Sequence, residues 1–183
     1  MHDDIQKILL DETAIRRTVE RLGIEISERY GDCELLVVSV LKGSLLFCAD
    51  LIRCIPLPLE LGFVEARSYR NGTDPGELEL RFQPDPDDIS GRHVLLVDDI
   101  LDSGQTLSFL ASHLRSVGAV DVAAAVLLDK PARRRAPFEA DFVGARIDDL
   151  FVVGYGLDYA GRYRNLPYVG SLRPELLGVG TTR

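Results

Sequence analysis

Short apolar runs alternate with segments of helical periodicity along this chain. Residues 35–40, 94–97 and 122–128 are almost wholly apolar and strand-sized, which is typical of strands buried on both faces. Between them, apolar residues recur at helical spacing over 45–52 and 106–117. This alternation predicts one α/β domain built around a mostly parallel sheet.

The N-terminal part follows the same pattern. Residues 5–10 read as a short strand, and apolar residues from Ile15 to Ile26 then recur at helical spacing. Asp11 and Glu12 suit the start of that helix, and Gly31 suits its end. Further predictions are a Ser44 cap on the helix at 45–52, a helix stop at Gly118-Ala119, and a short strand beginning at Val152-Val153.

The segment from 57 to 90 differs from the core pattern. Apolar residues alternate with others from Leu57 to Phe63, which predicts a strand with one buried face. Residues 71–90 are rich in Gly, Asn and Pro around a short alternating run at 78–82. We therefore expect a mobile β-flap rather than core at 71–90.

Composition narrows the class of protein. The chain has 183 residues, enough for one domain, and its net charge of -8 opposes non-specific attraction to nucleic acid or an anionic membrane. No apolar run has the roughly 20 residues of a membrane helix, and the acidic start at residues 1–4 does not read as a targeting signal. Cys33, Cys48 and Cys54 form no metal or disulfide pattern and are expected to be packing residues. A cytoplasmic protein is expected.

The most informative stretch is 94–107 (VLLVDDILDSGQTL). An apolar strand delivers Asp98 and Asp99 at its carboxyl end, where open α/β sheets bind ligands. The following loop supplies Gly104, hydroxyl side chains and a helix N-terminus, all of which suit a phosphate. In the alternative reading, Asp98 and Asp99 simply end a strand and Asp102 caps the helix.

This stretch resembles the phosphoribosyl pyrophosphate signature of type I phosphoribosyltransferases. Four further motifs narrow the resemblance to the hypoxanthine-guanine phosphoribosyltransferases: 41–44 (LKGS), 68–69 (SY), 127–130 (LLDK) and 151–159 (FVVGYGLDY), the last followed by Tyr163 and Arg164. The resemblance runs from about residue 9 to residue 174. Asp98 departs from it, because the family commonly has Glu there and Asp is one methylene shorter.

The resemblance implies an architecture and a reaction. The fold is the type I phosphoribosyltransferase fold, a single domain over 1–183 with a core at about 30–150, a mobile β-flap, and a smaller hood formed by the N-terminal segment and 151–183. The implied reaction joins hypoxanthine or guanine to 5-phosphoribosyl 1-pyrophosphate, giving IMP or GMP and pyrophosphate. Mg²⁺ as cofactor and a homodimer or homotetramer are implied as well, with no nucleic-acid or membrane partner.

The resemblance also assigns roles around the sugar and phosphate. Asp98 and Asp99 would hold the ribose hydroxyls, directly or through Mg²⁺ and water. The 5′-phosphate would lie in the loop formed by Asp102, Ser103, Gly104, Gln105 and Thr106. Asp102 looks like the family's general base toward the imidazole ring of the purine.

Other implied roles concern the purine and the leaving group. Lys130 would donate to the 6-oxo group, Phe151 would stack on the base, and the Val152 backbone would read its exocyclic edge. Asp158 would belong to the same pocket and coordinate a Mg²⁺ that bridges the pyrophosphate. Pyrophosphate would also bind Arg164 and the backbone amides of Lys42 and Gly43, in a loop that often holds a non-proline cis peptide in the family, while Ser68 and Tyr69 would close the flap over it.

Several plainer alternatives stay open at this stage. Lys130 reads equally as a solvated lysine, Phe151 as a core residue, and 133–135 as a solvated basic turn. A nucleotide-sensing, RNA-binding regulator on the same fold is a second function class, although the net charge of -8 argues against it. A related transferase for xanthine or adenine would share everything except the base pocket, and the order of preference between hypoxanthine and guanine is not fixed by the sequence.

Overall fold

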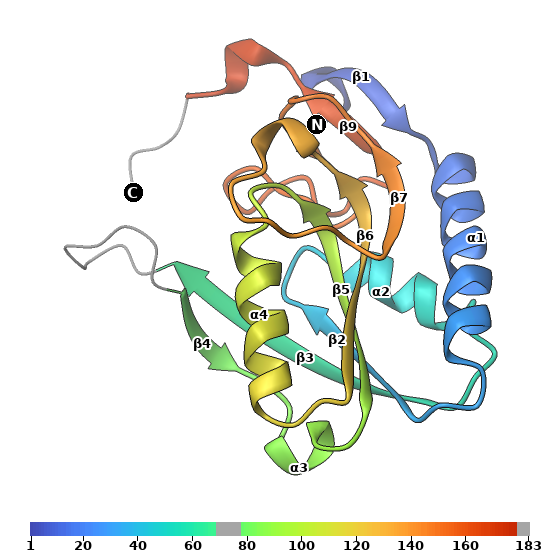
Figure 1. Cartoon of the computed structure of the whole chain (residues 1–183). Coiled ribbons are helices and arrows are strands. Elements are labelled where there is room, and N and C mark those ends of the chain that lie inside the picture. The colour runs from blue at the N-terminus through green and yellow to red at the C-terminus, as the bar shows by residue number, and fades with distance from the viewer. Residues whose placement is uncertain (69–77, 179–183) are drawn as a thin grey trace.

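The computed structural model describes residues 1–68 and 78–178, so Tyr69 lies outside the described residues. The chain folds into a large sheet and a small sheet with helices around the large one (Figure 1). The elements are β1 (Ile5–Leu10), α1 (Glu12–Tyr30), β2 (Leu35–Val40), α2 (Leu45–Ile52), β3 (Leu59–Ser68), β4 (Leu78–Phe82), α3 (Pro86–Ile89), β5 (His93–Leu101), α4 (Gln105–Ser116), β6 (Asp121–Asp129), β7 (Phe142–Arg146), β8 (Val152–Val153) and β9 (Val169–Leu172), with 3-10 turns η1 (His2–Asp4), η2 (Pro131–Arg133) and η3 (Pro174–Leu176).

The large sheet has the strand order β4-β3-β2-β5-β6-β7. All its neighbouring strands run parallel except the β3–β4 pair at one edge. Helices α1 and α2 cover one face and α4 covers the other, which is visible in Figure 1. The predicted mostly parallel α/β sheet is thereby confirmed.

Strand β2 shows why the central strands are apolar throughout. All six of its residues are buried. Val37 belongs to the apolar cluster with Leu22 and Phe47 on the α1 and α2 side, whereas Val38 belongs to the cluster with Leu110 on the α4 side. Because both faces are covered by helices, a strand here has no position for a polar face.

Helix α1 follows its predicted signals. Its apolar residues, from Ile15 to Ile26 along one face, are buried against the sheet. The carboxylate of Asp11 accepts a hydrogen bond from the Ala14 amide at 2.7 Å, which satisfies one of the free amides at the helix start. Gly31, with φ of +50°, ends the helix.

The small sheet joins distant parts of the sequence. Its strand order is β1-β9-β8 and all its pairs are antiparallel. Figure 1 shows this sheet above the carboxyl ends of β5 and β6. Its own apolar cluster includes Val153, Leu166, Tyr168 and Leu172. The N-terminal segment and the strands β8 and β9 near the C-terminus therefore form one layer over the carboxyl ends of the large sheet's strands.

Some local predictions were wrong. Ser44 occupies the N-cap position of α2, but its hydroxyl bonds to the Val40 carbonyl and the Ser39 hydroxyl instead of capping the helix. Leu61, expected on the buried face of β3, is 42% exposed. The segment 71–90 is also not entirely outside the core, since Ile89 of α3 is fully buried.

Other elements were longer than predicted or were missed. Strand β5 continues past Val97 to Leu101, because its pairing with β6 extends through Leu101 and Asp129. Strands β7 and β9 were missed since they are only five and four residues long and contain glycine. At Gly144 of β7 an added Cβ would lie 2.4 Å from the Leu127 carbonyl oxygen, so the glycine permits the close strand contact.

Candidate active site

The predicted site residues lie at the carboxyl ends of the parallel strands. Lys42 and Gly43 follow β2, Asp98 and Asp99 lie in the last half of β5, and Lys130 follows β6. The Lys130 amide donates to the Leu101 carbonyl at 2.9 Å, which holds the ends of β5 and β6 together. Chain segments that are far apart in sequence thus meet at one edge of the sheet, where open α/β sheets bind their ligands.

Asp98 and Asp99 form a pair of adjacent, partly buried carboxylates. Burial raises the pKa of Asp98 well above its ordinary value, and the neighbouring Asp99 charge adds to that shift. Burial also raises the pKa of Asp99, while the positive charge of Arg164 acts in the opposite direction. The Asp99 amide donates to Oδ1 of Asp98 at 2.9 Å. Two carboxylates held together in this way favour any ligand that brings positive charge or hydroxyl donors.

The loop after β2 packs directly on this pair. A Cβ added to Gly43 would lie 1.7 Å from Oδ2 of Asp99, and one added to Gly156, at φ of +100°, would lie 2.0 Å from the Gly43 carbonyl oxygen. Only glycine fits at position 156, where the contact is with backbone, and at position 43 any side chain would displace the Asp99 carboxylate. The peptide bond between Leu41 and Lys42 is cis, which confirms the expected non-proline cis peptide. The Lys42 side chain is exposed, so the backbone of this loop is what faces Asp99.

Asp102 lies in the loop between β5 and α4. Its Oδ1 atom is buried and has no hydrogen-bond partner among the described residues, and its Oδ2 atom lies 3.5 Å from Nη1 of Arg133. The reading of Asp102 as a helix cap is wrong, because the N-cap residue of α4 is Gly104, at φ of +79°. An unsatisfied buried carboxylate oxygen is costly unless a ligand supplies the donor. Asp102 therefore has the chemistry of a proton acceptor for a bound molecule.

The rest of the 102–106 loop surrounds the start of α4. The Gln105 amide donates to the Ser103 hydroxyl at 3.4 Å, and the hydroxyl-bearing Ser103 and Thr106 are both partly exposed. Helix α4 has 12 residues, and its N-cap residue, Gly104, has no side chain to cap the other free amides of the first turn. This combination of free amides, hydroxyls and a positive helix end suits an anion.

Lys130 is buried, with 4% of its surface exposed, so the reading as a solvated lysine is wrong. Burial lowers the pKa of its ammonium, while the carboxylates of Asp102 and Asp149 act in the opposite direction. The structure thus places a buried ammonium and the buried Oδ1 atom of Asp102 at neighbouring strand ends.

Val152 begins β8 of the small sheet, and Phe151 directly precedes it. Phe151 is 39% exposed, so the reading as a core residue is wrong. Its ring contacts the Tyr159 ring edge-on, with centroids 5.2 Å apart, and leaves part of its surface open for stacking. Val152 is buried and pairs with Ser171 of β9, which fixes its backbone.

Asp158 and Arg164 bind each other in the turns after β8. Nη2 of Arg164 lies 2.6 Å from Oδ1 of Asp158, and Nη1 donates to the Gly156 carbonyl at 2.6 Å. Oδ2 of Asp158 accepts from the Gly161 amide at 2.8 Å. The guanidinium is thereby held next to the Gly43–Gly156 contact and near Asp99.

The carboxylates of the site suit magnesium ions shared with a substrate. Among residues 1–68 and 78–178, no group of three or more His, Cys, Asp or Glu side chains forms a metal cage. Mg²⁺ in proteins is commonly held by one or two carboxylates together with water and substrate phosphate oxygens. The adjacent pair Asp98 and Asp99 meets that requirement, and so, separately, does Asp158.

Ser68 and Tyr69 were predicted at the flap, and Arg134 was missed by the sequence analysis. Ser68 ends β3, and Tyr69 lies outside the described residues. Reading 133–135 as a solvated turn was wrong for Arg134, whose side chain is only 18% exposed and donates to the Asp102 carbonyl at 2.6 Å. The sequence signal was weak, because three consecutive arginines do not reveal which one turns inward.

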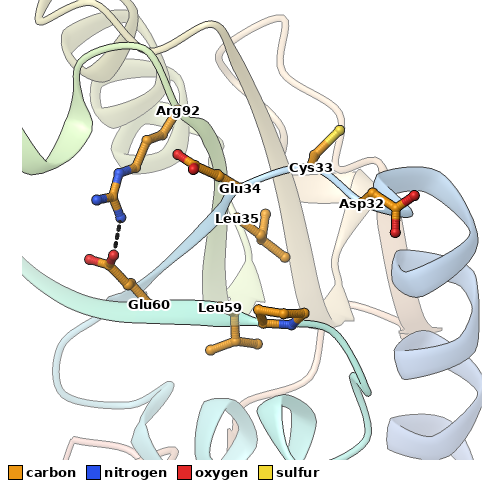
Figure 2. Close-up of a pocket in the computed structure, with 8 residues that line it drawn as sticks. Asp32, Cys33, Glu34, Leu35, Leu59, Glu60 and Arg92 are labelled. Atoms are coloured by element: carbon orange, nitrogen blue, oxygen red, sulfur yellow. Dashed lines mark ion pairs between the residues drawn. The ribbon is translucent and has the colours of Figure 1, made fainter.

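A polar cavity lies at the opposite end of the large sheet, where the strands begin (Figure 2). It has a volume of about 410 Å³. Its lining residues are Asp32, Cys33, Glu34, Leu35, Pro58, Leu59, Glu60 and Arg92. It contains none of the predicted site residues.

All three cysteines are free thiols, as expected.

Known proteins resemble the chain over nearly its whole length. A family model described as "Phosphoribosyl transferase domain" matches residues 6–160. The chain is 47% identical to a hypoxanthine-guanine phosphoribosyltransferase of Bacillus subtilis, with 96% of this chain and 98% of the relative covered. Among the described residues, no helix combines the length and apolar character needed to cross a membrane.

Solved structures agree with this. The fold matches a hypoxanthine phosphoribosyltransferase of Staphylococcus aureus with a TM-score of 0.91 at 41% identity, covering 96% of each chain. A ternary substrates complex of a variant of the Trypanosoma cruzi hypoxanthine phosphoribosyltransferase matches with a TM-score of 0.89 at 36% identity, covering 96% of this chain and 99% of that one. The chain therefore belongs to the phosphoribosyltransferase family, as a purine-salvage enzyme of its hypoxanthine-guanine phosphoribosyltransferase branch.

Proposed function

We propose that the site at the carboxyl edge of the large sheet transfers the phosphoribosyl group of 5-phosphoribosyl 1-pyrophosphate to hypoxanthine or guanine, giving IMP or GMP and pyrophosphate. The carrying observation is the buried Oδ1 of Asp102, which has no hydrogen-bond partner among the described residues. It lies in the loop beside the strand end that carries the buried Lys130. A 6-oxopurine offers both groups what they lack, an N–H donor for the carboxylate and a carbonyl oxygen for the ammonium.

Asp102 acts in this proposal as the general base. The bond from C1′ of the ribose to the pyrophosphate oxygen breaks, a bond from C1′ to a purine nitrogen forms, and Asp102 accepts the proton that the imidazole ring loses. Lys130 donates to the 6-oxo oxygen and so disfavours a 6-amino purine. Phe151 stacks on the base. The Val152 backbone contacts the exocyclic edge of the purine, and Asp158 lies in the same pocket.

The sugar and its phosphate take the neighbouring groups. Asp98 and Asp99 bind the ribose hydroxyls and stabilise positive charge as it develops on the ring. The 5′-phosphate binds the loop formed by Asp102, Ser103, Gly104, Gln105 and Thr106. Support for this assignment comes from the start of α4, where the N-cap residue Gly104 has no capping side chain and the helix end favours an anion.

The leaving pyrophosphate binds next to the Gly43–Gly156 contact. Backbone amides of Lys42 and Gly43 donate to it, and the Arg164 guanidinium, oriented by Asp158, neutralises part of its charge. Asp158, and separately the pair Asp98 and Asp99, would hold Mg²⁺, which would supply charge neutralisation for the pyrophosphate. In this proposal Ser68 and Tyr69 belong to a flap that excludes water from the reacting centre.

Three broader features belong to the same proposal. We expect the small sheet and 151–183 to act as a hood over a core at about 30–150, all within one domain. Homodimers or homotetramers are expected, and the exposed Leu45 and Leu46 of α2 are consistent with a covered surface. A cytoplasmic location is supported by the three free thiols, which suit a reducing compartment.

The experiment that tests the function is a coupled measurement of pyrophosphate release. The protein is supplied with phosphoribosyl pyrophosphate and Mg²⁺, and with hypoxanthine, guanine, xanthine or adenine in turn. Release with hypoxanthine and guanine but not adenine supports the proposal. Preference for xanthine or adenine would reassign the base pocket, and no release with any purine, combined with tight and steeply salt-dependent RNA binding, would favour a regulator.

A further inference from the structure

Arg134 bridges the ends of two parallel strands beneath the 102–106 loop. Its Nη1 atom donates to the carbonyl oxygens of Leu101 at 3.2 Å and Asp102 at 2.6 Å. Its Nη2 atom is hydrogen-bonded to Oδ1 of Asp129, a carboxylate whose side chain is 7% exposed. The planar guanidinium thus joins the carboxyl end of β5 to that of β6.

The backbone that follows Arg134 continues this contact. The amides of Arg135 and Ala136 both donate to the Ser103 carbonyl, at 2.9 and 3.0 Å. Three consecutive carbonyls, those of residues 101–103, are therefore all bound by the segment 134–136. Backbone carbonyls in a loop are normally satisfied by water or by varied partners, so a single segment that binds three of them fixes the orientation of the loop.

The orientation of the carbonyls determines that of the amides. In a planar trans peptide the N–H of one residue points opposite to the carbonyl of the residue before it. With the carbonyls of residues 101–103 directed at the segment 134–136, the amides of Asp102, Ser103 and Gly104 are directed away from it. Among the described residues, the amides of Ser103 and Gly104 have no acceptor, which leaves them available to an anion.

Gly104 lets the Arg134 side chain come close. A Cβ on Gly104 would lie 3.0 Å from Cδ of Arg134. The aliphatic stem therefore packs under the loop at the residue that begins α4. Arg134 supports the loop both through its stem and through its guanidinium.

We propose that Arg134 is a positioning residue, whose side chain holds the carbonyls of Leu101 and Asp102 on the same side of the loop as the Ser103 carbonyl, so that the loop amides converge on the 5′-phosphate. This inference rests on the proposed assignment of the 102–106 loop to that phosphate. Arg134 does not contact the substrate in this scheme. Lysine is a poor replacement, because a single ammonium lacks the planar fork that reaches two carbonyls and a carboxylate at once.

The test compares a ligand that carries the 5′-phosphate with one that lacks it. Calorimetry on the full chain gives the Kd of IMP and of inosine for the wild type and for Arg134→Met. We expect the variant to raise the Kd of IMP by about tenfold or more, as hydrogen bonds to a charged group are lost from the supporting network, and to leave the Kd of inosine within about twofold. A merely structural role for Arg134 would weaken both ligands alike.

Two further variants sharpen the test. Arg135→Met makes the same change in the neighbouring exposed side chain while keeping the backbone amide, and it should leave both affinities unchanged. Arg134→Lys keeps the charge, and we expect it to give an intermediate loss confined to IMP, about threefold to fivefold. If Arg134→Met does not fold, as judged by circular dichroism, Arg134→Lys decides alone, since an unchanged ratio of the two Kd values overturns the inference.

The outcomes separate this inference from the proposed function. A wild-type protein that binds IMP no more tightly than inosine would contradict the assignment of the 102–106 loop to the phosphate. A wild type that prefers IMP, with an Arg134→Met variant that keeps the same preference, would leave the function standing and overturn the positioning role.

Discussion

Acidic side chains lie near a basic one at both ends of the large sheet, where its strands begin and where they end. The two ends differ in whether the carboxylates are exposed and paired. At the amino edge, Glu60 is 59% exposed and forms an ion pair of 2.6 Å with Arg92, as the dashed line in Figure 2 marks. At the carboxyl edge, Asp98 and Asp99 are adjacent carboxylates whose pKa values are raised, and Asp102 keeps a buried oxygen without a partner in the described chain.

The difference indicates that unsatisfied buried carboxylates are found where the parallel strands end, at the candidate active site. An exposed ion pair such as Arg92–Glu60 adds little to stability and asks for no ligand. Buried carboxylates without adequate partners destabilise the folded protein, so they persist where a ligand satisfies them. A polar cavity is therefore weak evidence for a site on its own, and unsatisfied buried charge is the stronger sign.

The largest expected effect comes from replacing the base. Asp102→Asn keeps the shape of the side chain but removes the proton acceptor, so we expect kcat to fall by about 10² to 10⁴. The KM for phosphoribosyl pyrophosphate should change by less than about threefold, because the loop is preserved. Steady-state kinetics with hypoxanthine measures both quantities.

The matched control for that variant is Glu60→Gln, the same chemical change at the amino edge. It removes an exposed carboxylate far from the site and should leave kcat unchanged. A wild-type kcat in Asp102→Asn would show that another group accepts the proton.

A smaller effect is expected from Lys130→Met. Losing a hydrogen bond from a buried charged group costs about 1.5 to 3 kcal/mol, which is roughly 10-fold to 150-fold in kcat/KM for hypoxanthine. Adenine has no 6-oxo group, so its kcat/KM should change much less and the discrimination should shrink. Steady-state kinetics with both bases measures this, and an equal loss for the two would remove Lys130 from the base pocket.

The same residue predicts a pH dependence of stability. Burial lowers the pKa of Lys130 below its ordinary value of 10.5. Between the lowered pKa and 10.5 the unfolded chain holds a proton that the folded protein has released, so this group makes the free energy of unfolding rise with increasing pH there. Lys130→Met should remove that contribution, as denaturant titrations at several alkaline pH values would show. The exposed Lys7, changed to Met, is the control and should leave the slope as in the wild type.

Most of the fold was predictable because central strands are apolar on both faces. Residues 35–40 and 122–128 can only be buried strands, and the helices between them show a single apolar face. The missed strands β7 and β9 lack a long apolar run. Each is short, and it forms a strand because it pairs with β6 or with β1, respectively. The exposure of Leu61 could not be predicted either. Alternation of apolar residues shows that they share one face of the strand, but it does not show whether another layer covers that face.

The residues of the site could be predicted from their types and order in the sequence. The long-range contacts that orient them could not. Acids after an apolar strand, a glycine and hydroxyls before a helix indicate a phosphate site from local sequence alone. The contact of Gly43 with Asp99, and that of Arg134 with the Leu101 and Asp102 carbonyls, join segments more than 30 residues apart. Such contacts follow from the topology of the sheet, which one sequence does not display at the level of single side chains.

The smallest expected effect concerns Asp98, where the family commonly has Glu. Asp98→Glu adds one methylene to a carboxylate that already accepts the Asp99 amide at 2.9 Å and has Gly43 packed behind its neighbour. Charge is unchanged, so we expect the KM for phosphoribosyl pyrophosphate to shift by no more than about threefold, with kcat nearly constant. Steady-state kinetics checks this, with Asp98→Asn as the contrast. If Asp98→Glu lowered activity as strongly as Asp98→Asn, the reach of this carboxylate would matter as much as its charge, and the direct ribose contact would require the shorter side chain in this chain.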